Sequence, residues 1–255
     1  MRFEKKVEIL RIKKHQGIET GEFLYDVKRM AEGEAFEYLM EEVDFCGAKI
    51  DLSYRPMIPR YETEFWVRHA IENIKNRGSV YSMNVLDLFS GSGNVGLAIL
   101  KNIPEATVDM IEVDPKLKEQ IEISLVRNNI YQGRAQIITG DVWGKSSEGE
   151  DGAKGLYDYI FAVPPYVPQE MKEEVMQELS AEDPLAFFDK EDGYYYHKQV
   201  LSRGREFLKN DGVLFLEFDI TQREQIELLA QEFGWSNYSF LQDPYGHEYV
   251  IMLEK

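Results

Sequence analysis

The chain has 255 residues, 44% of them hydrophobic, which suits one large α/β domain with a small appendage. Its net charge is −17, from 46 acidic and 29 basic residues, and this disfavours nucleic acid as a partner because most of the surface repels a polyanion. The single cysteine, Cys46, excludes an internal disulfide and a cysteine pair for zinc or an iron–sulfur cluster. No stretch approaches the roughly 20 apolar residues of a membrane span and the first residues are charged, so we expect a cytoplasmic protein without a membrane segment.

Three kinds of element are expected before residue 84. Residues 1–40 are rich in charge with apolar side chains at helical spacing, which predicts two or three short amphipathic helices. In residues 45–59 apolar and polar side chains alternate around Gly47, which indicates a β-hairpin. A helix over residues 62–75 is expected to follow it. We therefore expect a helical segment over residues 1–44, a hairpin linker over 45–60 and a main domain over 61–255.

From residue 84 onward, strands and helices alternate, which is typical of a parallel sheet covered by helices on both faces. The predicted strands are 84–88, 107–112, 135–139, 157–163 and 213–218, and the predicted helices are 94–101, 116–129, 195–208 and 221–233. Two last runs, 236–241 and 248–253, flank a turn and predict a terminal antiparallel hairpin. The fold class is thus α/β, with a doubly wound, mostly parallel sheet of seven strands. The glycine-rich stretch Gly144–Gly155 is expected to be a solvated loop.

A ligand loop is indicated where the first parallel strand runs into Phe89-Ser90-Gly91-Ser92-Gly93, because small residues let a ligand approach the backbone. Glu112 ends the next strand about 20 residues beyond the glycines, where a carboxylate can accept both hydroxyls of a ribose. No lysine follows the glycines as in a phosphate-binding loop, and Asp87 beside the loop favours a cationic ligand such as an amino acid ammonium. A tight strand–helix turn without a ligand is the alternative.

The run Val85–Gly93 resembles motif I of class I S-adenosylmethionine methyltransferases. The resemblance implies S-adenosylmethionine as the cofactor, bound by Asp87, the glycine loop and Glu112. It also implies that Asp141 meets the adenine amino group and that Val142 lies near the adenine ring. For Asp141, a helix N-cap is the alternative role.

The fourth strand ends in Val163-Pro164-Pro165-Tyr166, which resembles the (Asp/Asn)-Pro-Pro-(Tyr/Phe) motif of methyltransferases that modify planar nitrogen. An amide nitrogen is a poor nucleophile, so acceptors must hold its N–H bonds and aim its lone pair at the methyl group. The resemblance implies that these four residues form the catalytic corner, with a side-chain oxygen at the first position and backbone carbonyls after it. The prolines fix the corner, Val163 also borders the cofactor, and the Tyr166 ring packs on the target side chain.

Val163 departs from this motif because it has no hydrogen-bonding group. Losing one acceptor leaves an amide hydrogen unpaired at a cost of about 1–3 kcal/mol, which would slow turnover on the order of 10- to 100-fold. Three interpretations stay open: an impaired or engineered active site, a rewired site that relies on backbone carbonyls, and a pseudoenzyme that only binds.

The segment Pro59-Arg60-Tyr61-Glu62-Thr63-Glu64 resembles the Pro-Arg-Pro-Glu-Thr-Glu signature of release factor glutamine methyltransferases, with Tyr61 in place of the second proline. The resemblance implies a class I peptide chain release factor as partner, methylated on the glutamine of its Gly-Gly-Gln loop. Arg60, Glu62, Thr63 and Tyr166 are the implied substrate-binding residues. Physically, Thr63 or Glu62 can cap the following helix and Arg60 can pair with a carboxylate. A surface cap with an ordinary ion pair is the alternative.

Two other functions remain open. The run Asp87–Gly93 and Ile160-Phe161 also resemble ribosomal RNA guanine-N2 methyltransferases, but the basic residues between Lys5 and Lys14 are interleaved with glutamates and read as a solvated helix face. A non-catalytic binding module is the second alternative, made credible by Val163. The four histidines lack ligand spacing, so no metal is expected. We expect the Tyr194–Tyr196 run to anchor a helix by burial, or else to line the substrate site.

Overall fold

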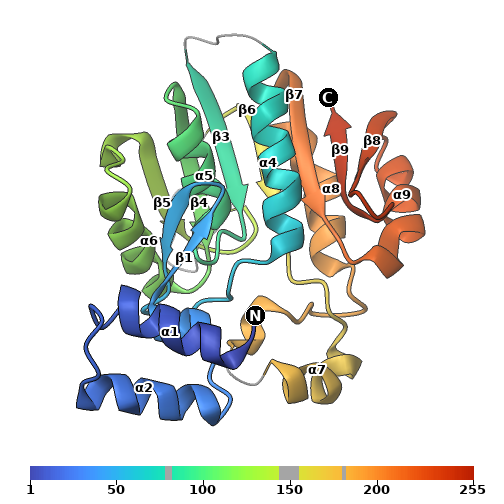
Figure 1. Ribbon diagram of the computed structural model, residues 1–255. Coiled ribbons are helices and arrows are strands. Elements are labelled where there is room, and N and C mark those ends of the chain that lie inside the picture. Colours follow the sequence, from blue (N-terminus) through green and yellow to red (C-terminus); the bar gives the residue numbers. More distant parts are fainter. Residues whose placement is uncertain (78–81, 144–154, 180–181) are drawn as a thin grey trace.

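The structure is a computed structural model that describes residues 1–77, 82–143, 155–179 and 182–255. Its centre is a seven-stranded sheet in the order β5-β4-β3-β6-β7-β9-β8 (Figure 1). Within this sheet β3 to β7 pair in parallel, and β9 and β8 complete it as an antiparallel hairpin. This confirms the predicted fold class. The strands are β3 (Met83–Leu88), β4 (Ala106–Glu112), β5 (Ala135–Thr139), β6 (Tyr157–Ala162), β7 (Leu208–Glu217), β8 (Asn237–Gln242) and β9 (Glu248–Glu254).

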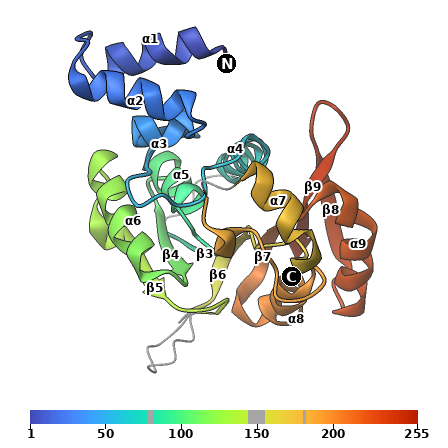
Figure 2. The same ribbon diagram turned by 90° about the horizontal axis from the view of Figure 1, so that it is seen from below.

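Helices cover both faces of the sheet because successive strand residues point to opposite sides. One face carries α4 (Tyr61–Asn76), α5 (Asn94–Asn102) and α6 (Pro115–Arg127), and the other carries α8 (Tyr195–Phe207) and α9 (Arg223–Glu232) (Figure 2). On the first face Trp66 of α4 stacks near Phe161 of β6 and Phe215 of β7. Chain order reverses between β3 and β6, and the crevice at such a switch point is where open α/β sheets bind ligands.

The N-terminal part forms short helices and a hairpin, as expected, but the hairpin spans Glu42–Asp51 rather than residues 45–59. Helices α1 (Phe3–Lys13), α2 (Gly21–Ala31) and α3 (Phe36–Met40) share a small core of their own, made of Leu10, Met30, Phe36 and Leu39. In Figure 1 they lie at the end of the molecule toward which the arrow of β3 points. Strands β1 (Glu42–Phe45) and β2 (Ala48–Asp51) pair around Cys46 and Gly47. Two backbone amides of β2 donate hydrogen bonds to the side chains of Ser124 in α6 and of Asn128 just after it. The hairpin is therefore fixed to the helix layer that covers the main sheet.

Some boundaries differ from the predictions for identifiable reasons. Strand β7 begins at Leu208 rather than at residue 213, because Leu208 pairs with Tyr157 and the turn-forming Asp211, at φ 63°, lies inside the strand. Residues Ile220–Gln222 form a 3₁₀ turn closed by an Asp219–Gln222 capping box, which delays the start of α9 to Arg223.

Four short elements were not predicted: α7 (Lys172–Glu178) and 3₁₀ turns at Gln132–Arg134, Gln169–Met171 and Pro184–Ala186. Residues 144–154 of the predicted glycine-rich loop lie outside the described residues. Among the helices that the structure describes, none combines the length and the apolar character needed to cross a bilayer.

Candidate functional site

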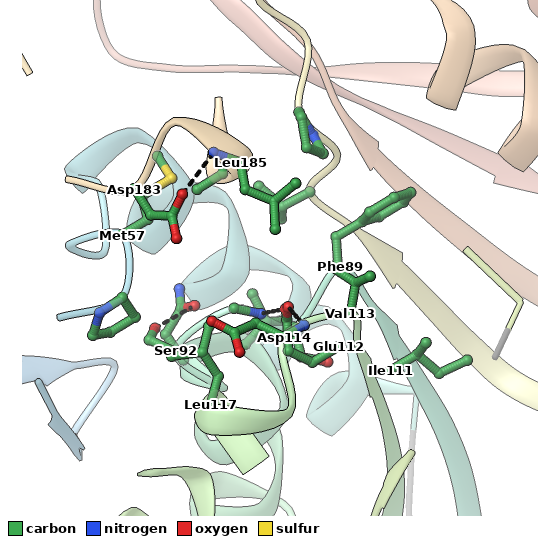
Figure 3. Close-up of a pocket in the computed structure, with 18 of the residues that line it drawn as sticks. Met57, Phe89, Ser92, Ile111, Glu112, Val113, Asp114, Leu117, Asp183 and Leu185 are labelled. Carbon is green, nitrogen blue, oxygen red and sulfur yellow. Dashed lines mark hydrogen bonds between the residues drawn. The ribbon is translucent and has the colours of Figure 1, made fainter. Parts of the chain in front are cut away.

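A cavity of about 270 Å³ opens at the carboxyl ends of β3, β4 and β6, close to the lower end of the volumes typical of small-molecule sites. Five groups of residues line it: the segment before α4, the glycine turn with the end of β4, residues 140–142 after β5, the corner after β6, and residues 182–194 between α7 and α8, here called the insertion. In Figure 3, Glu112 and Leu117 border the cavity on one side, and Met57, Asp183 and Leu185 on the other. The lining residues are 54–60, Thr63, 89–92, Asn94, Val95, 111–114, Leu117, 140–142, Val163, Pro165, Asp183, Leu185, Ala186, Lys190 and Tyr196.

The glycine turn has the tight geometry that its sequence predicted. Gly91 and Gly93 have φ values of 51° and 77°, and Phe89 also has a positive φ, 59°. A Cβ atom on Gly93 would lie 2.8 Å from Cγ1 of Ile121, so the absence of a side chain there lets α5 pack closely on α6. Gly93 therefore lies behind the cavity wall. The Phe89 ring packs edge-on against Tyr196 at 5.3 Å between centroids.

Glu112 is oriented by two backbone amides. Its Oε2 accepts a hydrogen bond from the Gly91 amide at 2.7 Å and its Oε1 one from the Asp114 amide at 2.8 Å (Figure 3). The side chain is 8% exposed and lines the cavity, and burial raises the pKa of its carboxyl, opposed by the backbone hydrogen bonds. Each carboxylate oxygen keeps a further lone pair, so the group suits two ribose hydroxyls. Asp141 and Val142 line the same cavity, as the adenine assignment requires.

Asp87 does not line the cavity. Its Oδ2 accepts a hydrogen bond from the Gly96 amide at 2.9 Å, in the first turns of α5, and the residue is 1% exposed. Burial raises the pKa of this carboxyl to about 7, against the hydrogen bonds from Gly96 and Ser90. The side chain thus holds the start of α5, where the N–H groups of the helix favour an acceptor, rather than facing the predicted ammonium.

The corner after β6 is only partly turned toward the cavity. Val163 and Pro165 line it, whereas Pro164 is buried behind them. Tyr166 also lies outside the lining: its ring is near that of His197, with 6.4 Å between centroids, and its carbonyl accepts a hydrogen bond from Gln222 at 3.2 Å. Burial raises the pKa of the Tyr166 hydroxyl far above its usual range. The ring therefore packs into the protein in this structure rather than into the space left for a target side chain.

The carboxyl group of Glu217 is buried behind the corner, and no role for it was predicted from the sequence. Glu217 ends β7, is 4% exposed, and accepts hydrogen bonds on Oε2 from the Thr63 hydroxyl at 2.7 Å and the Trp66 indole at 2.6 Å. Burial raises the pKa of Glu217 to about 7, against hydrogen bonds that include one from Tyr166. The signal in the sequence was a glutamate closing an otherwise apolar strand.

The predicted capping role of Thr63 or Glu62 is wrong. The N-cap of α4 is Arg60, and no side chain caps it. The Thr63 hydroxyl binds Glu217 instead, because a hydrogen bond to a buried carboxyl group is stronger than one to an exposed amide. Thr63 does line the cavity, whereas Glu62 does not.

Arg60 pairs with a carboxylate, as predicted. Its Nη2 lies 2.8 Å from Oε1 of Glu182, a buried residue of the insertion, and Oε2 of Glu182 accepts a hydrogen bond from the Ile58 amide at 2.8 Å. The segment before α4 is thereby joined to the insertion, and both line the cavity. Met57, Leu117 and Leu185 were missed as lining residues because nothing local marks an apolar loop or helix residue as facing a ligand.

The Tyr194–Tyr196 run packs at the start of α8, as predicted, and one of its rings borders the cavity. All three side chains are half-buried at the start of α8, and Tyr196 also lines the cavity. Lys190 was not anticipated. Its Nζ lies 5.3 Å from the centre of the Tyr196 ring, at the rim of the same cavity.

Known proteins resemble this chain in sequence and in fold. The release factor glutamine methyltransferase of Streptococcus pneumoniae is 27% identical over 239 residues, which covers 92% of this chain and 81% of that protein. The release factor glutamine methyltransferase of Thermodesulfovibrio yellowstonii is 28% identical over 233 residues, covering 90% and 79%. The crystal structure of a methyltransferase from Pyrococcus furiosus shares the fold, with a TM-score of 0.56 and 14% identity over 92% of this chain and 96% of that one.

These comparisons confirm the predicted resemblance and the class I methyltransferase fold, and they support an S-adenosylmethionine-dependent methyltransferase. The family described as conserved hypothetical protein 95 matches residues 54–200. This range contains every residue that lines the cavity, from Tyr54 to Tyr196. Because the match extends over more than half of the 255 residues, the chain belongs to the family of conserved hypothetical protein 95.

Proposed function

We propose that this protein is an S-adenosylmethionine-dependent N-methyltransferase of the cytoplasm that modifies the glutamine side chain in the Gly-Gly-Gln loop of class I peptide chain release factors. One observation carries the proposal. A single cavity joins the glycine turn and Glu112 to the Val163–Pro165 corner, in a chain similar over nine-tenths of its length to release factor glutamine methyltransferases.

The residues at the glycine end fit the cofactor. Glu112 would hold the ribose hydroxyls, and Asp141 would accept a hydrogen bond from the adenine amino group, with apolar Val142 and Leu117 beside the ring. When bound, S-adenosylmethionine supplies a methyl group on a positively charged sulfur, which leaves as a neutral thioether. The buried carboxyl of Glu112 supports this fit, since it is already fixed by two amides before any ligand arrives.

At the corner, the chain has to orient an amide. Pro164 and Pro165 carry no N–H groups, so the backbone there offers carbonyl acceptors without competing donors. In the transfer the glutamine nitrogen gains the methyl group and releases one of its protons to water. Acceptors that hold the N–H bonds raise the population of molecules whose lone pair is aimed correctly. Val163 provides no acceptor of its own, so a non-catalytic binding module is the second candidate function.

The acidic surface supports a protein rather than a ribosomal RNA as substrate. Within the predicted basic helix face, Arg11 pairs with Glu8 at 2.7 Å and Lys14 with Asp26 at 3.2 Å. Neutralised cations of this kind contribute little to the phosphate contacts that RNA binding requires.

The test incubates the protein with labelled S-adenosylmethionine and a release factor, and maps the methyl group by mass spectrometry. A release factor with the loop glutamine replaced by alanine is the control. Label on the glutamine supports the proposal. In the Val163→Asn variant, which restores one acceptor, transfer about 10- to 100-fold faster would mark an impaired site, and an unchanged rate would mark a site whose acceptor comes from another residue. If calorimetry shows cofactor binding but neither protein transfers methyl, the binding module replaces the enzyme; if the cofactor does not bind, both functions are wrong.

A further inference from the structure

The strand register sets Glu217 beside the residue that departs from the motif. Ala162 of β6 pairs with Leu216 of β7, so the next residues along the two parallel strands are Val163 and Glu217. Neighbouring strands lie about 4.8 Å apart, and side chains two residues apart share a face. Val163 and Glu217 therefore lie on the face of Phe161 and Phe215, which is covered by α4.

Thr63, in the first turn of α4, contacts Glu217 on this face of the sheet. Its hydroxyl has one hydrogen and two lone pairs, and the hydrogen is donated to Oε2 of Glu217 at 2.7 Å. The Trp66 indole donates to the same carboxyl oxygen at 2.6 Å, which restricts how the carboxyl group can turn. With its hydrogen committed, the Thr63 oxygen is left as an acceptor on a residue that lines the cavity.

Four other polar side chains of the lining, those of Arg60, Lys190, Ser90 and Ser92, are less suited to accept an N–H bond near Val163. Arg60 and Lys190 are donors only, and Arg60 is engaged by Glu182. Ser90 and Ser92 belong to the glycine turn, and their hydroxyls bind the Asp87 carbonyl and Asn94. Thr63 is the hydroxyl that a carboxyl group next to Val163 already orients.

We propose that the Thr63 hydroxyl accepts one N–H bond of the substrate amide in place of the side-chain oxygen that Val163 lacks, and that Glu217 is the positioning residue that aims it. This inference rests on the proposed function. It assigns Val163 to a rewired acceptor site rather than to a damaged one, and it gives the threonine of the segment before α4 a specific task at the substrate.

A purely structural role for Thr63 makes a different prediction. If the hydroxyl only satisfies the buried Glu217, removing it should slow methyl transfer by the same factor whatever stands at position 163. If it substitutes for the missing acceptor, restoring that acceptor should make the hydroxyl redundant. A double-mutant cycle separates the two, because it measures the dependence of one change on the other.

The experiment measures kcat and KM for methyl transfer to the release factor in four proteins: wild type, Thr63→Val, Val163→Asn and the double variant. Thr63→Val keeps the shape and removes the hydroxyl. We expect it to lower kcat about 10- to 100-fold in the wild-type background and less than about 3-fold with Val163→Asn present. Thr63→Ser, which keeps the hydroxyl, is expected to be faster than Thr63→Val. Calorimetry with S-adenosylmethionine checks that every variant still binds the cofactor.

Equal losses in both backgrounds, or a Thr63→Ser variant as slow as Thr63→Val, would overturn the inference. If Thr63→Val does not fold, Glu217→Gln replaces it in the same cycle, since the amide oxygen still accepts from Trp66 but holds the Thr63 hydrogen more weakly. Its loss of kcat should likewise shrink when Val163→Asn is present. Absence of transfer in every protein, including Val163→Asn alone, is a failure of the proposed function itself and removes this inference with it.

Discussion

The two ends of the cavity are built in different ways. At the glycine end, Gly91, Glu112 and Asp114 come from two adjacent strands and their loops, and backbone amides orient the one carboxylate. At the corner, Thr63, Val163 and Glu217 come from three separate elements: a buried hydrogen bond joins Thr63 to Glu217, and the strand register places Val163 beside Glu217. The first arrangement depends on local backbone geometry, and the second on tertiary packing. Substitutions at the two ends should therefore have different consequences.

The largest effect is expected at the glycine end, from Glu112→Ala. This change removes the proposed ribose acceptors and leaves the Gly91 and Asp114 amides without a partner. Hydrogen bonds to a charged group contribute about 1.5–3 kcal/mol each, so the Kd for S-adenosylmethionine should rise at least about 100-fold. Titration calorimetry measures it, with Glu122→Gln, an exposed carboxylate on α6, as the matched control. A Kd within a factor of three of the wild type would remove Glu112 from the cofactor site.

At the corner, Glu217 should make the free energy of unfolding depend on pH. The pKa of Glu217 is raised to about 7 in the folded protein by burial, above the 4.5 of a free side chain, so the folded state holds this proton more tightly than the unfolded state. The contribution of Glu217 to the free energy of unfolding is fully present below the unfolded-state pKa. It falls as pH rises toward 7, by about 2–3 kcal/mol between pH 5 and 7.

Urea unfolding across that range measures the effect, with Glu217→Gln as the comparison. The pKa of Asp87 is shifted in the same direction, to about 7, but Asp87 is present in both proteins, so the difference between their slopes reports Glu217 alone. We expect the variant to lose less stability as pH rises. Parallel curves would mean that Glu217 is ionised at a normal pKa and is not the buried group described here.

The contrast between the ends also explains what the sequence could predict. The glycine turn, Glu112 and the sheet follow from residues close together in the chain, through turn chemistry and strand–helix alternation. The Thr63–Glu217 bond joins residues 154 positions apart, and the Arg60–Glu182 pair residues 122 apart, so neither partner is visible without the register of β6 and β7 or the path of the insertion. Asp87 shows a subtler limit: its place at the end of a strand was predicted, but not that its side chain turns to the α5 amides.

A smaller effect is expected where the insertion is joined to the segment before α4. Glu182→Ala removes the acceptor of both Arg60 and the Ile58 amide, and the pair is largely but not wholly shielded from water. We expect the free energy of unfolding to fall by about 2 kcal/mol. Glu32→Ala serves as the control, because the Lys28–Glu32 pair is exposed and should contribute less than about 1 kcal/mol. Equal losses in the two variants would show that the Glu182 contacts are no stronger than a surface pair.

The smallest effect is expected at Phe89 in the glycine turn, where the cost of the positive φ can be measured separately from the packing of the ring. Its φ of 59° costs a residue with a side chain about 1 kcal/mol, while its ring gains a contact of similar size with Tyr196. Phe89→Gly relieves the first and loses the second, so its free energy of unfolding should stay within about 1 kcal/mol of the wild type. Phe89→Ala loses the ring but keeps the strain, and should be about 1 kcal/mol less stable than Phe89→Gly. Urea unfolding of the pair decides it: if the alanine and glycine variants are equally stable, the positive φ at this position carries no cost and the ring contact alone accounts for the stability of the wild type here.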